Sequence, residues 1–297
     1  MAATDVQPGT GTVGLPRTGT VSADGNRVIW LLLAAAFVAI LNETTMGVAI
    51  PHLITDLGIT AVAAQWLTTA FMLTMAVVIP ITGFLLRRFP TRVMFIAAMS
   101  LFSLGTLIAL VSPGFPTLLV GRVVQASGTA IMMPLLMTTI MNVVPPHARG
   151  RMMGRVSMVI ALAPAIGPTM SGVLLDTLGW RWIFGIVLPI ALAALAVGAI
   201  WIRNIGETIR EPIDALSVVL SAFGFGGVVY GLSQIGGAAA HGGSAAEEAA
   251  GTAATTTLIV SLAVGAIALA LFAWRQIALQ TRGVPLLDLR VFRSANF

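Results

Sequence analysis

The sequence predicts an all-α integral membrane protein with about eight spans. Hydrophobic residues make up 57% of its 297 residues and charged residues 9%, and its mean hydropathy is +0.97. Soluble domains carry about 25% charged residues, so this composition indicates a membrane protein. The apolar residues form eight runs that reach the roughly 20 residues needed to cross a bilayer. The spans must be helical, because an open sheet would leave unpaired backbone groups in lipid.

The limits of the spans follow from the apolar runs, to within a few residues. They are 28–50, 61–84, 93–112, 116–141, 156–175, 181–202, 214–235 and 254–275. The first 27 residues are rich in Gly, Thr, Pro and Ala, so we expect a disordered tail. They lack the charged start, short apolar core and cleavage site of a signal peptide.

Arginine placement predicts the orientation. The net charge of +5 involves no lysine, and with the N-terminus inside, fourteen of the sixteen arginines fall in inner segments. Only Arg181 falls in an outer loop, and Arg122 lies within the fourth span. This bias predicts a cytoplasmic N-terminus. It also explains the positive net charge by membrane orientation, so the charge does not indicate binding to nucleic acid. The sequence contains no cysteine and no motif for a nucleotide or a metal, so we expect no cofactor.

Two charged residues lie inside spans. Glu43 is about 21 Å into the first span, in a hydrocarbon layer about 30 Å thick. An acid at this depth must face a cavity, find a partner or be protonated, which predicts a functional group. The alternative is an acid packed against another helix and paired with Arg122. Arg122 itself could snorkel toward the surface or pair with a carboxylate.

Four motifs, together with Gln65-Trp66 and Trp180-Arg-Trp-Ile-Phe184, suggest a family. The motifs occupy 40–51 (ILNETTMGVAIP), 83–92 (GFLLRRFPTR), 121–128 (GRVVQASG) and 163–172 (APAIGPTMSG). In order and spacing the sequence resembles the major facilitator superfamily, specifically the fourteen-span EmrB/QacA-type branch of its drug:proton antiporters. The resemblance covers residues 28–297.

The resemblance implies a domain organisation. Residues 1–27 would be a cytoplasmic tail, and 28–202 a six-helix N-terminal transport domain of 3+3 inverted repeats. Residues 203–276 would form an extra two-helix hairpin. Residues 277–297 would be a cytoplasmic loop leading to a further span, so the C-terminal half of the transporter is expected to be absent.

The resemblance also assigns proton coupling to the first and fourth spans. Asn42 stands where the family has an aspartate, and the adjacent Glu43 would take over its role from a position about 100° further round the helix. Arg122 matches the arginine that the family links to proton transfer. Gln125 and Thr44 are expected along the substrate path.

Two further motifs suggest gating and export. The positions that match the gating loop between the second and third spans are Gly83, Leu85, Arg88 and Arg92, although Arg87 replaces the family's aspartate and Pro90 a glycine. Orientation alone would also explain these arginines. In the fifth span, Gly167, Pro168 and Gly172 match the motif that separates exporters from symporters. Ala163, Gly167 and Ser171 repeat every four residues, a spacing that close packing alone would explain.

The sequence therefore predicts the N-terminal portion of a transporter rather than an enzyme. We expect proton-coupled efflux of lipophilic, often cationic, drugs or other small molecules across the plasma membrane of a bacterium. Its partners would be substrate, protons, the lipid bilayer and the missing C-terminal transport domain. The alternative is a truncated half-protein or scaffold that does not transport.

Overall fold

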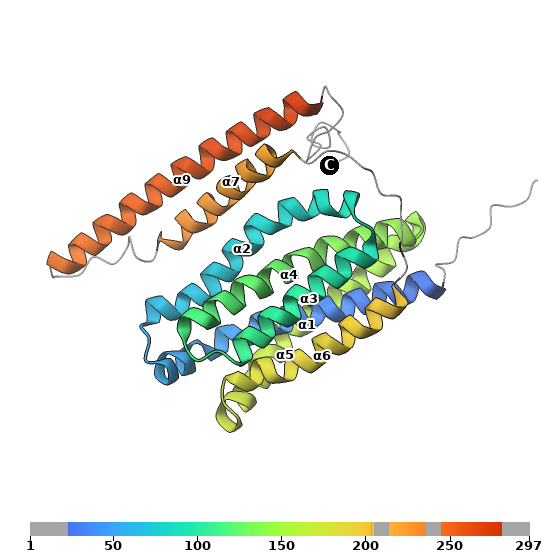
Figure 1. The fold of residues 1–297 in the computed structure, drawn as a ribbon, viewed down its shortest axis with the longest axis horizontal. Helices are drawn as coiled ribbons and strands as arrows, with labels where there is room; N and C mark the ends of the chain where they lie inside the picture. Colours follow the sequence, from blue (N-terminus) through green and yellow to red (C-terminus); the bar gives the residue numbers. More distant parts are fainter. Residues whose placement is uncertain (1–22, 203, 205–213, 236–244, 281–297) are drawn as a thin grey trace, which may run out of the picture.

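The computed structural model describes residues 23–202, 204, 214–235 and 245–280, and all regular secondary structure in these ranges is helical. Eight of the described helices are long and apolar enough to cross a membrane, which confirms the predicted fold class. They are α1 (Ala23–Leu57), α2 (Ala61–Arg88), α3 (Thr91–Leu110), α4 (Phe115–Val143), α5 (Pro146–Thr177), α6 (Arg181–Trp201), α7 (Ala215–Ser233) and α9 (Ala245–Gln280) (Figure 1).

Several helices are longer than the predicted spans. Helix α1 already begins at Ala23, and α5 begins at Pro146 rather than near residue 156. Only Val144 and Pro145 separate α4 from α5. The apolar runs mark the part of each helix that suits lipid, whereas the backbone hydrogen bonds of a helix continue beyond that part to its capping residues. Helices α1, α2, α4, α5 and α6 each even continue through a proline. Thr60 provides such a cap, since its hydroxyl accepts a hydrogen bond from the Ala63 backbone at the start of α2.

Helices α1 to α6 form one bundle, in which α3 packs along α4 and α1 packs along α5 and α6 (Figure 1). Two apolar clusters fill its interior. The first centres on Leu32 of α1, Phe95 of α3 and Leu136 of α4. The second lies further along the same helices, around Met46 and Trp180. Each helix thus supplies apolar side chains at two levels and leaves a layer between them.

Helices α7 and α9 lie side by side, and α7 packs against α2 (Figure 1). Their backbones meet at Gly265, where a Cβ atom would lie 2.7 Å from the backbone nitrogen of Val228. Small residues allow such contact where no hydrophobic force draws helices together in lipid.

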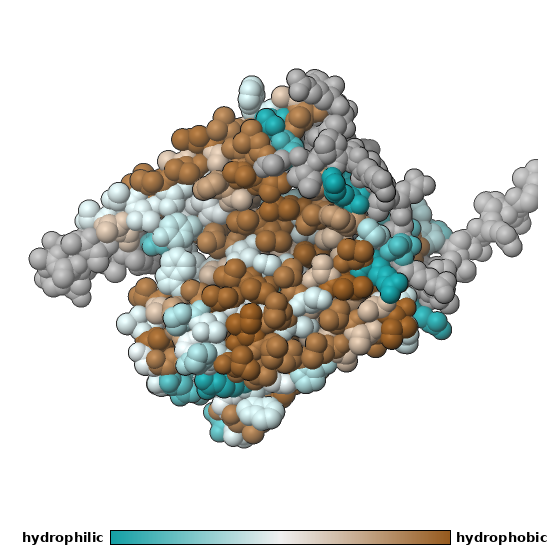
Figure 2. Space-filling model, viewed as in Figure 1, coloured by the Kyte–Doolittle hydropathy of each residue, from teal (hydrophilic) through white to brown (hydrophobic). Residues whose placement is uncertain are grey.

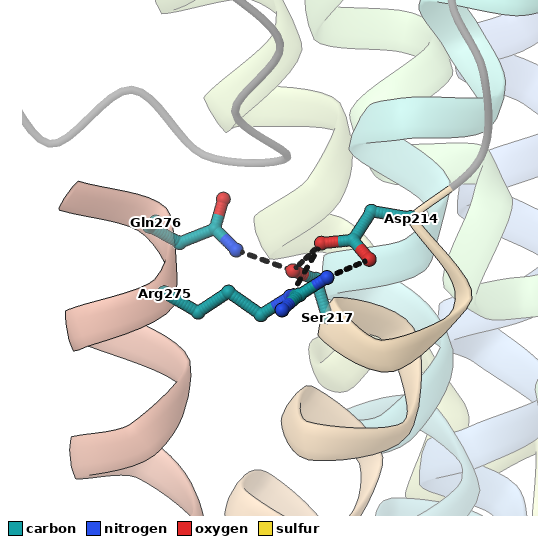
Figure 3. Close-up of polar contacts among 4 residues, drawn as sticks. All are labelled: Asp214, Ser217, Arg275 and Gln276. Atoms are coloured by element: carbon teal, nitrogen blue, oxygen red, sulfur yellow. Dashed lines mark hydrogen bonds and ion pairs between the residues drawn. The ribbon is translucent and has the colours of Figure 1, made fainter. Parts of the chain in front are cut away.

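A polar cluster joins α9 to the start of α7 (Figure 3). The Arg275 guanidinium donates two hydrogen bonds of 2.8 Å to the Asp214 carboxylate. The Ser217 hydroxyl also donates to Asp214, and the Gln276 amide donates to Ser217 Oγ at 2.8 Å. The hydrogen bonds from Arg275 are the main reason that the pKa of Asp214 falls to about 2. The cluster therefore keeps its charges at neutral pH.

The outer surface of the bundle is largely apolar. Hydrophobic side chains cover the middle of the face shown in Figure 2, and hydrophilic side chains gather toward its two ends. The exposed residues on α9 include Val264, Leu271 and Trp274. This distribution suits contact with the hydrocarbon core of a bilayer.

Candidate functional site: a polar layer inside the bundle

A layer of buried polar side chains crosses the bundle between its two apolar clusters. Its members come from α1, α3, α4 and α5: Asn42, Thr45, Ser103, Thr106, Arg122, Gln125, Thr129 and Ser171. Buried polar groups cost free energy unless they find partners, and this cost is greatest where lipid surrounds the bundle. Such a layer is where a membrane protein concentrates function.

Arg122 is the only charged side chain among the described residues that is almost completely buried, with 1% of its surface exposed. Its Nη1 donates a hydrogen bond of 2.7 Å to Gln125 Oε1, and its Cζ lies 4.0 Å from the centre of the Phe71 ring. Its Nε has no hydrogen-bond partner in the described part of the chain. The buried position excludes the snorkelling alternative, and the cation is held mainly by uncharged groups.

Gln125 is oriented by a neighbour on α3. Its Nε2 donates a hydrogen bond of 2.8 Å to Thr106 Oγ1, and that hydroxyl donates to the Phe102 carbonyl at 2.6 Å. Because the Thr106 proton is used in this way, its oxygen is left to accept from Gln125. The amide must therefore present its oxygen to Arg122. The helices meet closely here, since a Cβ atom at Gly105 would lie 2.3 Å from the Gln125 backbone nitrogen.

Thr106 and Phe71 were missed by the sequence analysis. Both lie in apolar runs on helices other than that of Arg122, and no spacing within the sequence links them to it. Only the packing of α2 and α3 against α4 brings them together.

The two candidate proton-coupling residues of α1 lie in different surroundings. Asn42 is fully buried, and neither polar atom of its side chain has a hydrogen-bond partner among the described residues. Glu43 is only partly buried, and it interacts electrostatically with Arg122 across a gap. The structure thus brings Glu43 and Arg122 together without a direct ion pair, and it places Asn42 in the bundle interior.

Thr44 lies at the contact between α1 and α5. Its hydroxyl donates to the Leu41 carbonyl at 2.9 Å, and a Cβ atom at Gly167 would lie 2.3 Å from its Oγ1. One turn further along α5, the Ser171 hydroxyl donates to the Thr45 carbonyl at 3.0 Å. The four-residue repeat of the fifth span therefore packs directly on the helix that carries Glu43.

The other two residues of the antiporter motif lie outside this contact. Pro168 is exposed, and a Cβ atom at Gly172 would meet nothing within 4 Å. Of the three matched positions, Gly167 alone is required for close approach to α1.

All four residues assigned to the gating loop lie in helices rather than in the expected loop, and their role in gating stays a prediction. Gly83, Leu85 and Arg88 belong to the end of α2, and Arg92 belongs to the first turn of α3. Helix α2 continues through Pro80 and Gly83 to Arg88, and Phe89 and Pro90 then cap the end of α2 and the start of α3. Arginines in a last turn also stabilise the carboxyl end of a helix.

Arg92 has a structural partner that the sequence analysis did not foresee. Its Nη2 donates a hydrogen bond of 2.6 Å to the Ala199 carbonyl at the end of α6. Arg149 does the same for α4, where its Nη2 donates to the Met141 carbonyl at 2.9 Å. Both arginines satisfy terminal carbonyl groups that would otherwise lack partners.

The site contains no metal-binding arrangement in the described ranges. No group of three His, Cys, Asp or Glu side chains gathers anywhere among these residues. Arg122 is the one ionisable member of the polar layer defined above, and Glu43 lies beside the layer on α1.

Comparison with known proteins agrees with the fold. Residues 32–287 match the family described as the Major Facilitator Superfamily. The chain is similar to a bacterial homolog of the human lysosomal transporter Spinster, solved in an inward-facing, unoccupied conformation, with a TM-score of 0.56. That match has 16% sequence identity and covers 82% of this chain and 60% of the other, so it supports the fold and nothing further.

Curated bacterial relatives are more similar in sequence. The chain is 45% identical over 270 residues to the uncharacterized MFS-type transporter YcnB of Bacillus subtilis, covering 91% of the chain and 54% of the relative. It is 43% identical, with the same coverage, to the lincomycin resistance protein LmrB of Listeria monocytogenes. Identity to the multidrug export protein EmrB of Haemophilus influenzae is 30%, over 92% of the chain and 51% of the relative. The chain thus spans about half the length of these relatives.

Proposed function

Because the chain belongs to the major facilitator superfamily, we propose that it is the N-terminal portion of a proton-coupled exporter of lipophilic, often cationic, small molecules. Its place would be the bacterial plasma membrane, with the N-terminus in the cytoplasm and the proton gradient as the energy source. The observation that carries the proposal is the separated pair of Glu43 and Arg122 inside a membrane bundle.

The arrangement of the pair assigns different roles to its members. Arg122 is fully buried and is held by Gln125 and Phe71, whose interactions do not depend on the state of Glu43. Its positive charge is therefore a constant part of the site. Glu43 is partly exposed and forms no direct ion pair with any residue that the structure describes, so it is the group that we expect to gain and lose a proton.

Protonation of Glu43 would remove its attraction to Arg122 and its attraction to a cationic substrate. Both changes favour substrate release and a change in the position of α1. Since α5 packs on α1 at Thr44 and Gly167, movement of α1 would be passed to the helix with the antiporter motif. Alternating access of two repeats about a central site is the general scheme for such transporters.

The names of the relatives favour export of antimicrobial compounds. LmrB is named for lincomycin resistance and EmrB for multidrug export. We therefore propose that the substrates of the complete transporter include such compounds, and that the test should use lincomycin as well as a lipophilic cationic dye.

The experiment measures proton-driven efflux of ethidium and of lincomycin from everted vesicles containing the product of the complete reading frame. Glu43→Gln is expected to abolish proton-driven efflux of both compounds and to weaken the binding of cationic ethidium, because the amide mimics the protonated acid. Asp56→Asn is the matched control, because Asp56 is an exposed acid on the same helix. Efflux at the original rate by Glu43→Gln would show that the proposed proton coupling is wrong.

A further inference from the structure

A hollow between α2 and α7 takes no part in the proposed transport chemistry. Its enclosed volume is about 120 Å³, and it is partly open to its surroundings. Its lining consists of Val62, Gln65, Trp66 and Thr69 from α2, with Ser233 and Gln234 from the end of α7. The four α2 residues follow the spacing of one helix face. The hollow exists only because the α7–α9 hairpin packs against the bundle.

The lining combines polar groups with one aromatic surface. Gln65 and Gln234 carry amide groups and Thr69 carries a hydroxyl, so the hollow can both donate and accept hydrogen bonds. The Ser233 hydroxyl donates to the Tyr230 carbonyl at 2.7 Å and accepts a long hydrogen bond of 3.5 Å from the Gln234 amide. No charged side chain lines the hollow among the residues that the structure describes. The amide of Gln65 and the hydroxyl of Thr69 have no hydrogen-bond partner in the described part of the chain, so both are free to bind a ligand.

The aromatic surface is held in place. The Tyr230 ring lies 5.8 Å from the Trp66 ring, centre to centre, with a tilt of 37° between their planes. This contact limits the movement of the indole ring. Tryptophan and tyrosine often anchor helices at a membrane interface, which would explain the ring pair. It would not explain why two amides and two hydroxyls converge beside the indole.

We propose that this hollow binds an uncharged, polyhydroxylated ring such as a hexose, with the ring's apolar face on Trp66 and its hydroxyl groups on Gln65, Thr69 and Gln234. A charged group would lose its hydration here and find no opposite charge. The ring could come from a free glycoside or from the headgroup of a neutral glycolipid. The proposal does not depend on Glu43 and stands apart from the transport mechanism.

The test measures binding of 4-nitrophenyl β-D-glucopyranoside to the full chain in phosphatidylcholine nanodiscs, by saturation-transfer NMR with titration. Trp66→Leu is expected to weaken binding about fivefold, as the loss of one aromatic stacking contact predicts. Trp274→Leu is the matched control and should leave binding unchanged, because Trp274 lies on the exposed surface of α9.

A second pair of variants tests the hydrogen bonds without changing the aromatic ring. Thr69→Val is expected to weaken binding about threefold, whereas Thr255→Val, at an exposed site on α9, should have no effect. The charged analogue 4-nitrophenyl β-D-glucuronide should bind at least about tenfold more weakly than the glucoside, since a buried carboxylate would lack a partner.

A third arm adds monoglucosyl diacylglycerol to the nanodiscs. If a lipid headgroup is the source of the ring, this lipid will lower the apparent affinity for the soluble glucoside, and if a free solute is the source, it will not. The proposal fails if the glucoside shows no saturable binding, if the glucuronide binds equally well, or if the two tryptophan variants behave alike.

Discussion

Thr106→Val tests how the buried arginine is oriented. The substitution keeps the shape of the side chain and removes the hydroxyl that accepts a hydrogen bond from Gln125. Because Gln125 is fully buried, its Nε2 would then lack a partner, or the amide would turn and present a donor to Arg122. We expect Thr106→Val to lower the free energy of unfolding and to disturb Arg122.

The magnitude follows from the contacts that are lost. A buried amide donor without a partner costs about 1–3 kcal/mol, and hydrogen bonds between membrane helices contribute about 0.6–2 kcal/mol. The expected loss is therefore about 1–2 kcal/mol. Thr139→Val is the matched control, because Thr139 is also buried and also donates to the carbonyl four residues earlier. Since that hydroxyl accepts no hydrogen bond from another side chain among the described residues, its loss should cost less.

The assay is reversible unfolding in mixed micelles, combined with the pH dependence of efflux for the product of the complete reading frame. Thr106→Ser should restore both properties, since it keeps the hydroxyl. A simple packing role would change stability and leave the pH profile unaltered. Equal losses of stability for Thr106→Val and Thr139→Val would refute the proposed orienting role.

Two other predictions concern helix contacts and pH. Gly167→Ala should lower the free energy of unfolding by about 1–3 kcal/mol, because its Cβ atom would lie 2.3 Å from Thr44 Oγ1. At Gly172 an added Cβ atom meets nothing within 4 Å, so Gly172→Ala should change the free energy of unfolding by no more than about 0.5 kcal/mol in the same assay. The pKa of Asp214, about 2, lies below its ordinary value of 3.8, so its ion pair stabilises fully above about pH 4 and is lost as the pH falls through 2. In thermal melts at pH 6, Asp214→Asn should therefore unfold at a lower temperature than the original protein. Near pH 2 the two proteins should unfold at the same temperature. A gap independent of pH would show that the charge of Asp214 does not contribute.

The sequence was sufficient for the fold class because lipid leaves few alternatives. An apolar run of about 20 residues in a bilayer must be a helix, and eight such runs predict eight spans. Helix ends were less predictable, since hydropathy marks where lipid lies and not where backbone hydrogen bonds stop. The start of α5 at Pro146 and the helical positions of Leu85 and Arg88 both follow from this difference.

The site was predictable only in part. Glu43 and Arg122 could be singled out from the sequence, because ionisable residues are rare in spans. The partners that fix Arg122 could not, since Phe71 and Thr106 are ordinary residues within their own helices. Their importance comes from contacts between helices, and such contacts cannot be predicted from the spacing of residues within one helix.

The acid of α1 is one position away from where the family keeps its aspartate, and the structure supplies a physical reason for this position. Residue 42 points into the closed interior, where even the uncharged Asn42 leaves both polar atoms without partners among the described residues. A carboxylate there would be buried without compensation, at a cost of several kcal/mol. One residue later, a turn of about 100° brings Glu43 to a partly exposed face within the field of Arg122. In this chain the two positions are therefore not interchangeable, and position 43 is the one from which the proposed proton exchange beside Arg122 would take place.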